Sequence, residues 1–233
     1  MAATHPVLGI IGGMGPDGTL ELMRRIVART PAADDRDHLH MIVESNPKIP
    51  SRIAHLVERT GEDPTPEIVR IARNLERAGA TVLAMPCNTA HGYADAIRAG
   101  VAIPLLDMIA LTTAHLARAV PGRRIGLLAS TAVYNTRLYE RALDASDACI
   151  VPPRDQHAVM ELIRGVKRGE SGTVPRERLH NIAAELAERC DGLLIACTEL
   201  SVLAEGLSAP VPIIDSLDVL TDAILHRMTG NGD

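Results

Sequence analysis

The sequence predicts an α/β protein made of two similar, duplicated α/β domains with mostly parallel sheets. Short runs rich in Val, Ile and Leu alternate along the chain with longer segments of helical periodicity, a rhythm typical of parallel strands covered by helices. The same rhythm, with several short sequence landmarks, occurs once in each half of the 233 residues. A chain of this length fits one large domain or two small ones.

The elements of the first half follow from this rhythm. Its expected strands are 7–11, 39–44, 81–85 and 101–106. A glycine-rich turn follows the first of them and leads into a helix that ends near Arg29. A second helix, 64–78, ends at Gly79, a residue that suits a helix C-terminus.

The second half repeats landmarks of the first in the same order, at a nearly constant offset of roughly 110 residues. They are a glycine in the first strand of each half, a cysteine after a buried strand, and an aspartate after a proline-containing strand. The pairs are Gly9 and Gly126, Cys87 and Cys197, and Asp107 and Asp215. Their shared order indicates a duplicated unit, and we interpret the two aspartates as hydrogen-bonding residues at strand ends.

A boundary between the halves is expected at 119–124, where a Pro-Gly pair interrupts a helical pattern. The first domain is therefore predicted at residues 1–119 and the second at 120–216. The C-terminal helix, 217–233, is expected to complete the first domain, because the two ends of a chain often lie close together.

Composition excludes several classes of function. The chain has 24 Lys and Arg against 29 Asp and Glu and contains neither Phe nor Trp, so no nucleic-acid partner is expected. No apolar run approaches the ~18 residues of a membrane-spanning helix, and the first residues lack the pattern of a signal peptide. We expect no membrane partner, and a cytoplasmic protein with free thiols.

One motif imitates a nucleotide site. Gly13-Met-Gly-Pro-Asp-Gly18 matches the dinucleotide fingerprint and follows a predicted strand. The acids available to bind a ribose, Asp34, Asp35 and Asp37, precede the second strand instead of following it. We therefore expect no nucleotide cofactor here. The turn is expected to let backbone N–H groups approach an anion such as a carboxylate at a helix N-terminus.

Cys87 and Cys197 are the main candidates for chemistry. Each follows a predicted buried strand and precedes a helix, at the sheet edge where open α/β proteins bind ligands. Because a helix N-terminus lowers the pKa of a nearby thiol, both thiols are expected to ionise more easily than a free cysteine. Cys149 and Cys190 lack this setting and are interpreted as structural.

The same thiols allow two other interpretations. Cys87 and His91 with Cys197 would supply three zinc ligands, but no fourth ligand is evident, so no metal is expected. A disulfide switch between the two cysteines is disfavoured in a reducing compartment. His91 is interpreted mainly as a partner for a backbone group. Glu199 is interpreted either as a helix cap or as a residue that orients the Cys197 thiol.

Two thiols that face one carbon from opposite sides suit a proton transfer that inverts a stereocentre. One thiolate removes the proton, and the other thiol returns a proton to the opposite face. Because the α-proton of an amino acid is very weakly acidic, the developing enediolate needs fixed hydrogen-bond donors. Asn88, Thr89 and Thr198, with their backbone N–H groups, are the candidate donors.

At these residues the sequence resembles the aspartate/glutamate racemase family, whose members work without pyridoxal phosphate, and within it most closely the microbial aspartate racemases. The matching stretches occur in order through nearly the whole chain, at 11–16, 46–50, 86–91 and 196–199. The resemblance implies two similar α/β domains with the active site in the interdomain cleft, commonly in a homodimer. It implies no cofactor, and a small acidic amino acid as the partner.

The resemblance also implies individual roles. Cys87 and Cys197 become the two acid/base residues. Arg52 and Lys167 are expected to bind the side-chain carboxylate, because Arg clamps a carboxylate bidentately and Lys supplies a movable charge. The full set of implied substrate-binding residues is Met14, Arg52, Asn88, Thr89, Thr131, Lys167 and Thr198.

Three positions depart from the family pattern. Ser51 stands in place of an Asp, Gly18 in place of an Ala, and Ala132-Val133 in place of a frequent Gly-Thr pair. The predicted function is a cofactor-independent racemase that interconverts L- and D-aspartate, with glutamate as a second substrate. The alternatives are a maleate cis–trans isomerase or another reaction of the superfamily, and a non-catalytic protein that binds acidic metabolites.

Overall fold

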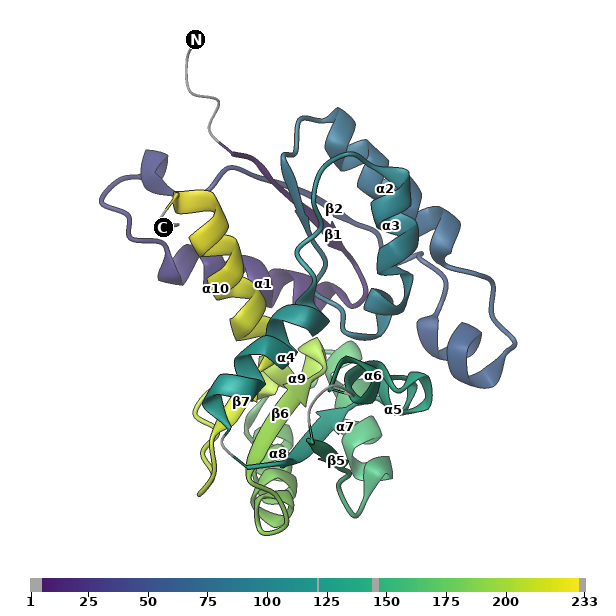
Figure 1. The fold of residues 1–233 in the computed structure, drawn as a ribbon, viewed down its shortest axis with the longest axis vertical. Helices are drawn as coiled ribbons and strands as arrows, with labels where there is room; N and C mark the ends of the chain where they lie inside the picture. Colours follow the sequence, from purple (N-terminus) through teal and green to yellow (C-terminus); the bar gives the residue numbers. More distant parts are fainter. Residues whose placement is uncertain (1–5, 121, 144–146, 231–233) are drawn as a thin grey trace.

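The computed structural model describes residues 6–120, 122–143 and 147–230. Pro121, at the predicted boundary, and residues 1–5, where a signal peptide would begin, lie outside that part. Figure 1 shows two sheets, one from each half of the chain, each flanked by helices. The strands are β1 (Leu8–Gly12), β2 (Met41–Ser45), β3 (Val82–Ala84), β4 (Arg124–Ala129), β5 (Cys149–Val151), β6 (Gly192–Ala196) and β7 (Ile213–Asp215).

Helices follow nearly every strand. Those of the first half are α1 (Pro16–Arg29), α2 (Thr65–Arg77), α3 (Ala94–Gly100) and α4 (Met108–Ala119), with short helical turns η1 (Asp35–Asp37), η2 (Ala54–Glu58) and η3 (Thr89–Tyr93). Those of the second half are α5 (Thr131–Thr136), α6 (Leu138–Leu143), α7 (Gln156–Lys167), α8 (Thr173–Ala187), α9 (Thr198–Leu203) and α10 (Ser216–Thr229).

The strands of both sheets are parallel and have equivalent orders. The first sheet has the order β2-β1-β3 and the second β5-β4-β6-β7, so the first strand of each half pairs with both its successors. β1 and β6 are buried throughout, which explains their unbroken apolar sequences. The predicted duplicated α/β architecture is confirmed.

One predicted strand is much shorter than expected. The segment 101–106 contributes only a single parallel bridge, between Leu83 and Leu105. Pro104 has no N–H to extend a ladder, although its carbonyl accepts a hydrogen bond from the Leu83 N–H at 2.8 Å. In the second half the Pro212 carbonyl accepts from the Leu193 N–H in the same way, and there three residues form β7.

The repeated landmarks have matching structural roles. A Cβ added to Gly9 would lie 2.8 Å from side-chain atoms of Ala80 and Leu83, and one added to Gly126 would lie 2.7 Å from Leu193. Both glycines therefore let a neighbouring strand and helix approach the central strand. Asp107 and Asp215 cap the N-termini of α4 and α10, accepting hydrogen bonds from backbone N–H groups there.

Two helices connect the halves. On α4, Met108 belongs to the core of the first sheet, whereas Ile109 and Leu116 belong to that of the second. The apolar side of α10 packs under the first sheet, where Leu220 and Ile224 join Leu8 and Ile10 of β1. In Figure 1 the yellow α10 accordingly lies beside α1 at the other end of the sequence.

Candidate active site

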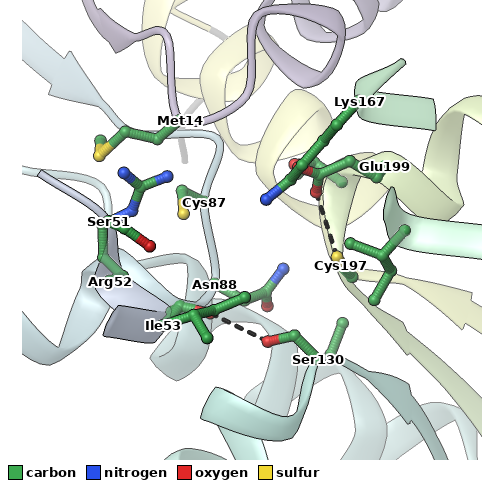
Figure 2. A pocket seen from close by; sticks show the side chains of 14 residues that line it. Met14, Ser51, Arg52, Ile53, Cys87, Asn88, Ser130, Lys167, Cys197 and Glu199 are labelled. Carbon is green, nitrogen blue, oxygen red and sulfur yellow. Dashed lines mark hydrogen bonds and ion pairs between the residues drawn. The ribbon is translucent and has the colours of Figure 1, made fainter. Parts of the chain in front are cut away.

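A cavity of ≈ 40 Å³ lies where β3 and β6, from different halves, end. Met85 and Pro86 separate Cys87 from the end of β3, whereas Cys197 directly follows the last residue of β6. Figure 2 shows the two sulfur atoms on different sides of the cavity. The lining residues are Met14, Ser51, Arg52, Ile53, Cys87, Asn88, Thr89, Ser130, Ile163, Lys167, Ala196, Cys197, Thr198 and Glu199.

The structure brings all but one of the residues predicted for the site to this cavity. The exception is Thr131, which begins α5 and does not line it. Its neighbour Ser130, in extended conformation at the N-cap, lines the cavity instead. From the sequence alone, either of the adjacent hydroxyl residues Ser130 and Thr131 could line the cavity. The backbone conformation at the start of α5 decides which of the two side chains faces inward.

The Cys197 thiol has a charged environment. Its Sγ donates a hydrogen bond to Glu199 Oε2 at 3.1 Å, and Glu199 Oε1 lies 3.6 Å from Lys167 Nζ. Burial, followed by the Glu199 charge and hydrogen bond, raises the pKa of Cys197 well above its ordinary value; Lys167 and the Glu199 N–H lower it less. The expectation that a helix N-terminus would make this thiol more acidic is therefore wrong, since α9 has only six residues and carries a buried carboxylate in its first turn.

The Cys87 corner is built differently. Cys87 precedes a short 3₁₀ turn, η3, instead of an α-helix. His91 Nδ1 lies 2.9 Å from the Cys87 carbonyl oxygen, and its Nε2 lies 3.1 Å from the Met108 N–H. His91 therefore donates from Nδ1 and accepts at Nε2, as a neutral ring, and burial lowers its pKa. Both ring nitrogens are hydrogen-bonded to backbone groups, as the sequence interpretation of His91 as a backbone partner expects.

Arg52 is the cation on the Cys87 side of the cavity. In the described part of the chain it forms no ion pair, and its buried Nε has no hydrogen-bond partner. Its Nη1 donates to the Pro50 carbonyl at 3.1 Å, which holds the guanidinium at the cavity wall (Figure 2). A partly buried guanidinium with unused donors is a ready site for a carboxylate.

Hydrogen bonds join the two halves around the cavity. Thr198 Oγ1 donates to the Pro86 carbonyl at 3.3 Å, and the Thr89 and Ser130 hydroxyls lie 3.3 Å apart. Asn88 Nδ2 donates to Ser216 Oγ at 3.1 Å, and its second N–H is left over for another acceptor. The predicted donor residues thus also hold the halves in register.

The glycine-rich turn has a packing role. Gly13 has φ +91°, and a Cβ there would lie 2.4 Å from the Asn46 backbone. A Cβ on Gly18 would lie 2.5 Å from Thr198 Oγ1, and one on Gly15 would lie 3.1 Å from Glu199 Oε1. The glycines therefore let this turn pack closely against Asn46 and against Thr198 and Glu199 of the second half.

The other cysteines lie away from the cavity. All four cysteines are free; Cys190 is buried in the core of the second half, with its Sγ 3.1 Å from the Leu186 carbonyl oxygen. Cys149 is exposed on the edge strand β5. Across residues 6–120, 122–143 and 147–230, no three His, Cys, Asp or Glu side chains are grouped to hold a metal ion. In those same ranges no helix is long and apolar enough to span a bilayer.

The fold agrees with the comparisons with known proteins. The family described as Asp/Glu/hydantoin racemase matches residues 11–224, so the chain belongs to that family and is an isomerase of the racemase type. The resemblance noted from the sequence is confirmed.

Relatives of this chain include racemases with different named substrates. The broad specificity amino-acid racemase RacX of Bacillus subtilis (strain 168) is 25% identical over 215 residues, 90% of this chain and 92% of that protein. The structure of Picrophilus torridus aspartate racemase matches with a TM-score of 0.86 and 31% identity, covering 97% of this chain and 94% of the other. Glutamate racemase isoform RacE1 from Bacillus anthracis shares the fold, with a TM-score of 0.71 at 17% identity over 99% of this chain and 84% of that one.

Proposed function

We propose that this protein is a cofactor-independent racemase of acidic amino acids, with aspartate as its main substrate and glutamate as a second. Cys87 and Cys197 act as the two acid/base residues. The 31% identity to an aspartate racemase over nearly the whole chain supports the choice of aspartate.

The charges that line the cavity carry the proposal. Arg52 and Lys167 are cations and Glu199 is an anion. An acidic amino acid carries two carboxylates and one ammonium group, the complementary set. Arg52 donates from its unused N–H groups to one carboxylate and Lys167 binds the other, while the negative charge of Glu199, whose oxygens stay bound to Cys197 and Lys167, favours the ammonium group in the cavity. No such complementarity exists for a neutral amino acid with one carboxylate.

The chemistry follows from the two thiols. A thiolate on one side takes the Cα proton, so that an S–H bond forms as the C–H bond breaks and the electron pair passes to the α-carboxylate as an enediolate. The thiol on the other side then gives its proton to the opposite face of Cα and becomes a thiolate. The second side-chain N–H of Asn88 and the hydroxyls of Thr89 and Ser130 donate hydrogen bonds that stabilise the enediolate oxygens.

The same charges disfavour the alternatives. Maleate has two carboxylates and no ammonium group, so Glu199 would repel it. A protein that only binds acidic metabolites has no use for two buried thiols at equivalent positions of a duplicated fold, 7% and 8% exposed. The three departures from the family pattern, at Ser51, Gly18 and Ala132-Val133, leave both thiols in place.

Proton NMR of L-aspartate in D₂O, with reductant and no added cofactor, tests the proposal. We expect the Cα proton signal to disappear while chiral analysis shows D-aspartate. Cys87→Ala and Cys197→Ala are each expected to lower racemisation by at least about 10³-fold, because each removes one acid/base group. The matched control is Cys149→Ala, on the exposed edge strand, which keeps full activity. Full racemisation by either single variant would refute the two-cysteine mechanism.

The homodimer and the cytoplasmic location stay predictions. Size-exclusion chromatography with light scattering measures the first: a dimer of this chain has twice the 24.9 kDa of the monomer.

A further inference from the structure

We propose that Glu199 is a positioning residue that holds the proton on the Cys197 thiol in the free protein, with Lys167 limiting how strongly it does so. The inference deepens the proposed function and rests on it for its catalytic consequence. It decides between the two interpretations of Glu199 that the sequence leaves open, a helix cap and an orienting partner of the thiol.

The contacts of Glu199 support this role. One carboxylate oxygen accepts the Cys197 S–H at 3.1 Å and the other lies 3.6 Å from Lys167 Nζ, so both are occupied by side chains of the cavity. Figure 2 shows the carboxylate between Cys197 and Lys167, with the hydrogen bond to the sulfur drawn as a dashed line. The Glu199 side chain is only 6% exposed, so solvent does little to screen its charge. The N-cap of α9 is Cys197, and the contacts that the Glu199 carboxylate makes within the described residues are with side chains, Cys197 and Lys167.

The charges that bear on the Cys197 thiol are few. Glu199, from α9 itself, favours the thiol, and Lys167, from the end of α7, favours the thiolate. Across the cavity, in the first half, lie Cys87 and Arg52.

The charged groups behind α9 act on other atoms. Arg25 of α1 donates to the Ser201 carbonyl at 2.9 Å, and Asp215, beside α10, accepts from Ser201 Oγ at 2.7 Å. Both are therefore bound one helical turn beyond the thiol. They fix the direction of α9, whereas Glu199 and Lys167 set the protonation of its N-cap residue, Cys197.

The arrangement gives the two thiols unequal starting states. In the free protein Cys197 is the proton donor, so the removal of a proton from the substrate falls to Cys87. The resting form then acts on the enantiomer whose Cα–H points at Cys87. Loss of the Cys197 proton at high pH leaves no donor, so it determines the alkaline limb of kcat/KM.

The test measures the protonation of Cys197 without reference to activity. The wild-type protein and its variants are alkylated with iodoacetamide across a pH series, and mass spectrometry of the Cys197 peptide gives the rate at each pH. The midpoint of the curve of rate against pH reports the pKa of the Cys197 thiol, whereas the access of iodoacetamide to the cavity changes only the maximum rate. In Glu199→Gln we expect the midpoint to fall by about one pH unit or more, because the negative charge is lost. In Lys167→Met we expect it to rise.

The control is Glu161→Gln, which removes a carboxylate that pairs with Arg164 outside the cavity and is expected to leave the midpoint unchanged. The alkaline limb of kcat/KM in Glu199→Gln should move with the midpoint, whereas a helix-capping role would lower activity equally at every pH. An unchanged midpoint in Glu199→Gln, or in Lys167→Met should the first variant not fold, overturns the proposal. A shifted midpoint in a protein without racemase activity would keep the role of Glu199 and refute the proposed function.

Discussion

The two halves carry the same cysteine at the same place in the same fold, yet the two corners differ. Cys197 directly follows a five-residue strand, is the N-cap residue of α9 and donates a hydrogen bond to a buried carboxylate. Cys87 follows a three-residue strand through Met85-Pro86 and precedes a 3₁₀ turn whose His91 is neutral. A duplicated fold thus supplies two equivalent positions, and the neighbours of each position make one of them a proton donor.

The same contrast exists at the aspartates that cap α4 and α10. Asp215 is nearly fully buried and bonds to Arg25 Nη1 at 2.7 Å and to Ser201. Asp107 is partly exposed and bonds to Arg98 on the surface. Asp215 therefore joins the two halves, because Arg25 comes from α1. Within the described residues, Asp107 bonds only to residues of its own half.

The largest expected effect is on the free energy of unfolding, which should fall much more when Asp215 is replaced than when Asp107 is. Asp215→Ala leaves Arg25 buried without its inner partner and is expected to lower the free energy of unfolding by about 3–5 kcal/mol. Asp107→Ala removes a helix cap and an exposed pair and is expected to cost about 1 kcal/mol. Urea denaturation of both variants gives the two values. Equal losses would show that the halves are held together elsewhere.

The next effect compares the cation of each half. Arg52→Ala is expected to raise KM for aspartate by roughly 10- to 100-fold, because it removes a partly buried guanidinium with no carboxylate partner in the described chain. Lys167→Met is expected to raise KM less, since Glu199 already offsets part of its charge. Initial rates over a range of aspartate concentrations measure both. An unchanged KM in Arg52→Ala would remove Arg52 from the substrate site.

The smallest effect concerns the contact between α1 and α9. In Gly18→Ala the new methyl group would lie 2.5 Å from Thr198 Oγ1, so Thr198 or α1 must shift next to Cys197. We expect kcat/KM to fall roughly tenfold, in line with the cost of overpacking a tight contact. Gly92→Ala is the matched control, because a Cβ there meets nothing within 4 Å. Full activity in Gly18→Ala would mean that the cleft is more adaptable than this contact suggests.

Much of the architecture is readable from the sequence because it is written in local patterns. The unbroken apolar strands predict parallel sheets, and the paired landmarks predict the duplication. Strand length is less local: the segment 101–106 has the composition of a strand, but Pro104 limits it to one bridge, at Leu105. Composition indicates that a strand is possible, whereas pairing depends on which backbone N–H groups exist and face a partner.

By itself, the sequence determined the α/β duplication, the two prominent cysteines and the family to which the chain belongs. Only the tertiary structure decided that Ser130 and not Thr131 faces the cavity, that the glycine turn packs against Thr198 and Glu199, and that Cys197 holds its proton. The physical reason is burial. A helix start lowers the pKa of a thiol that water can reach, but desolvation and a carboxylate 3.1 Å away outweigh six residues of helix.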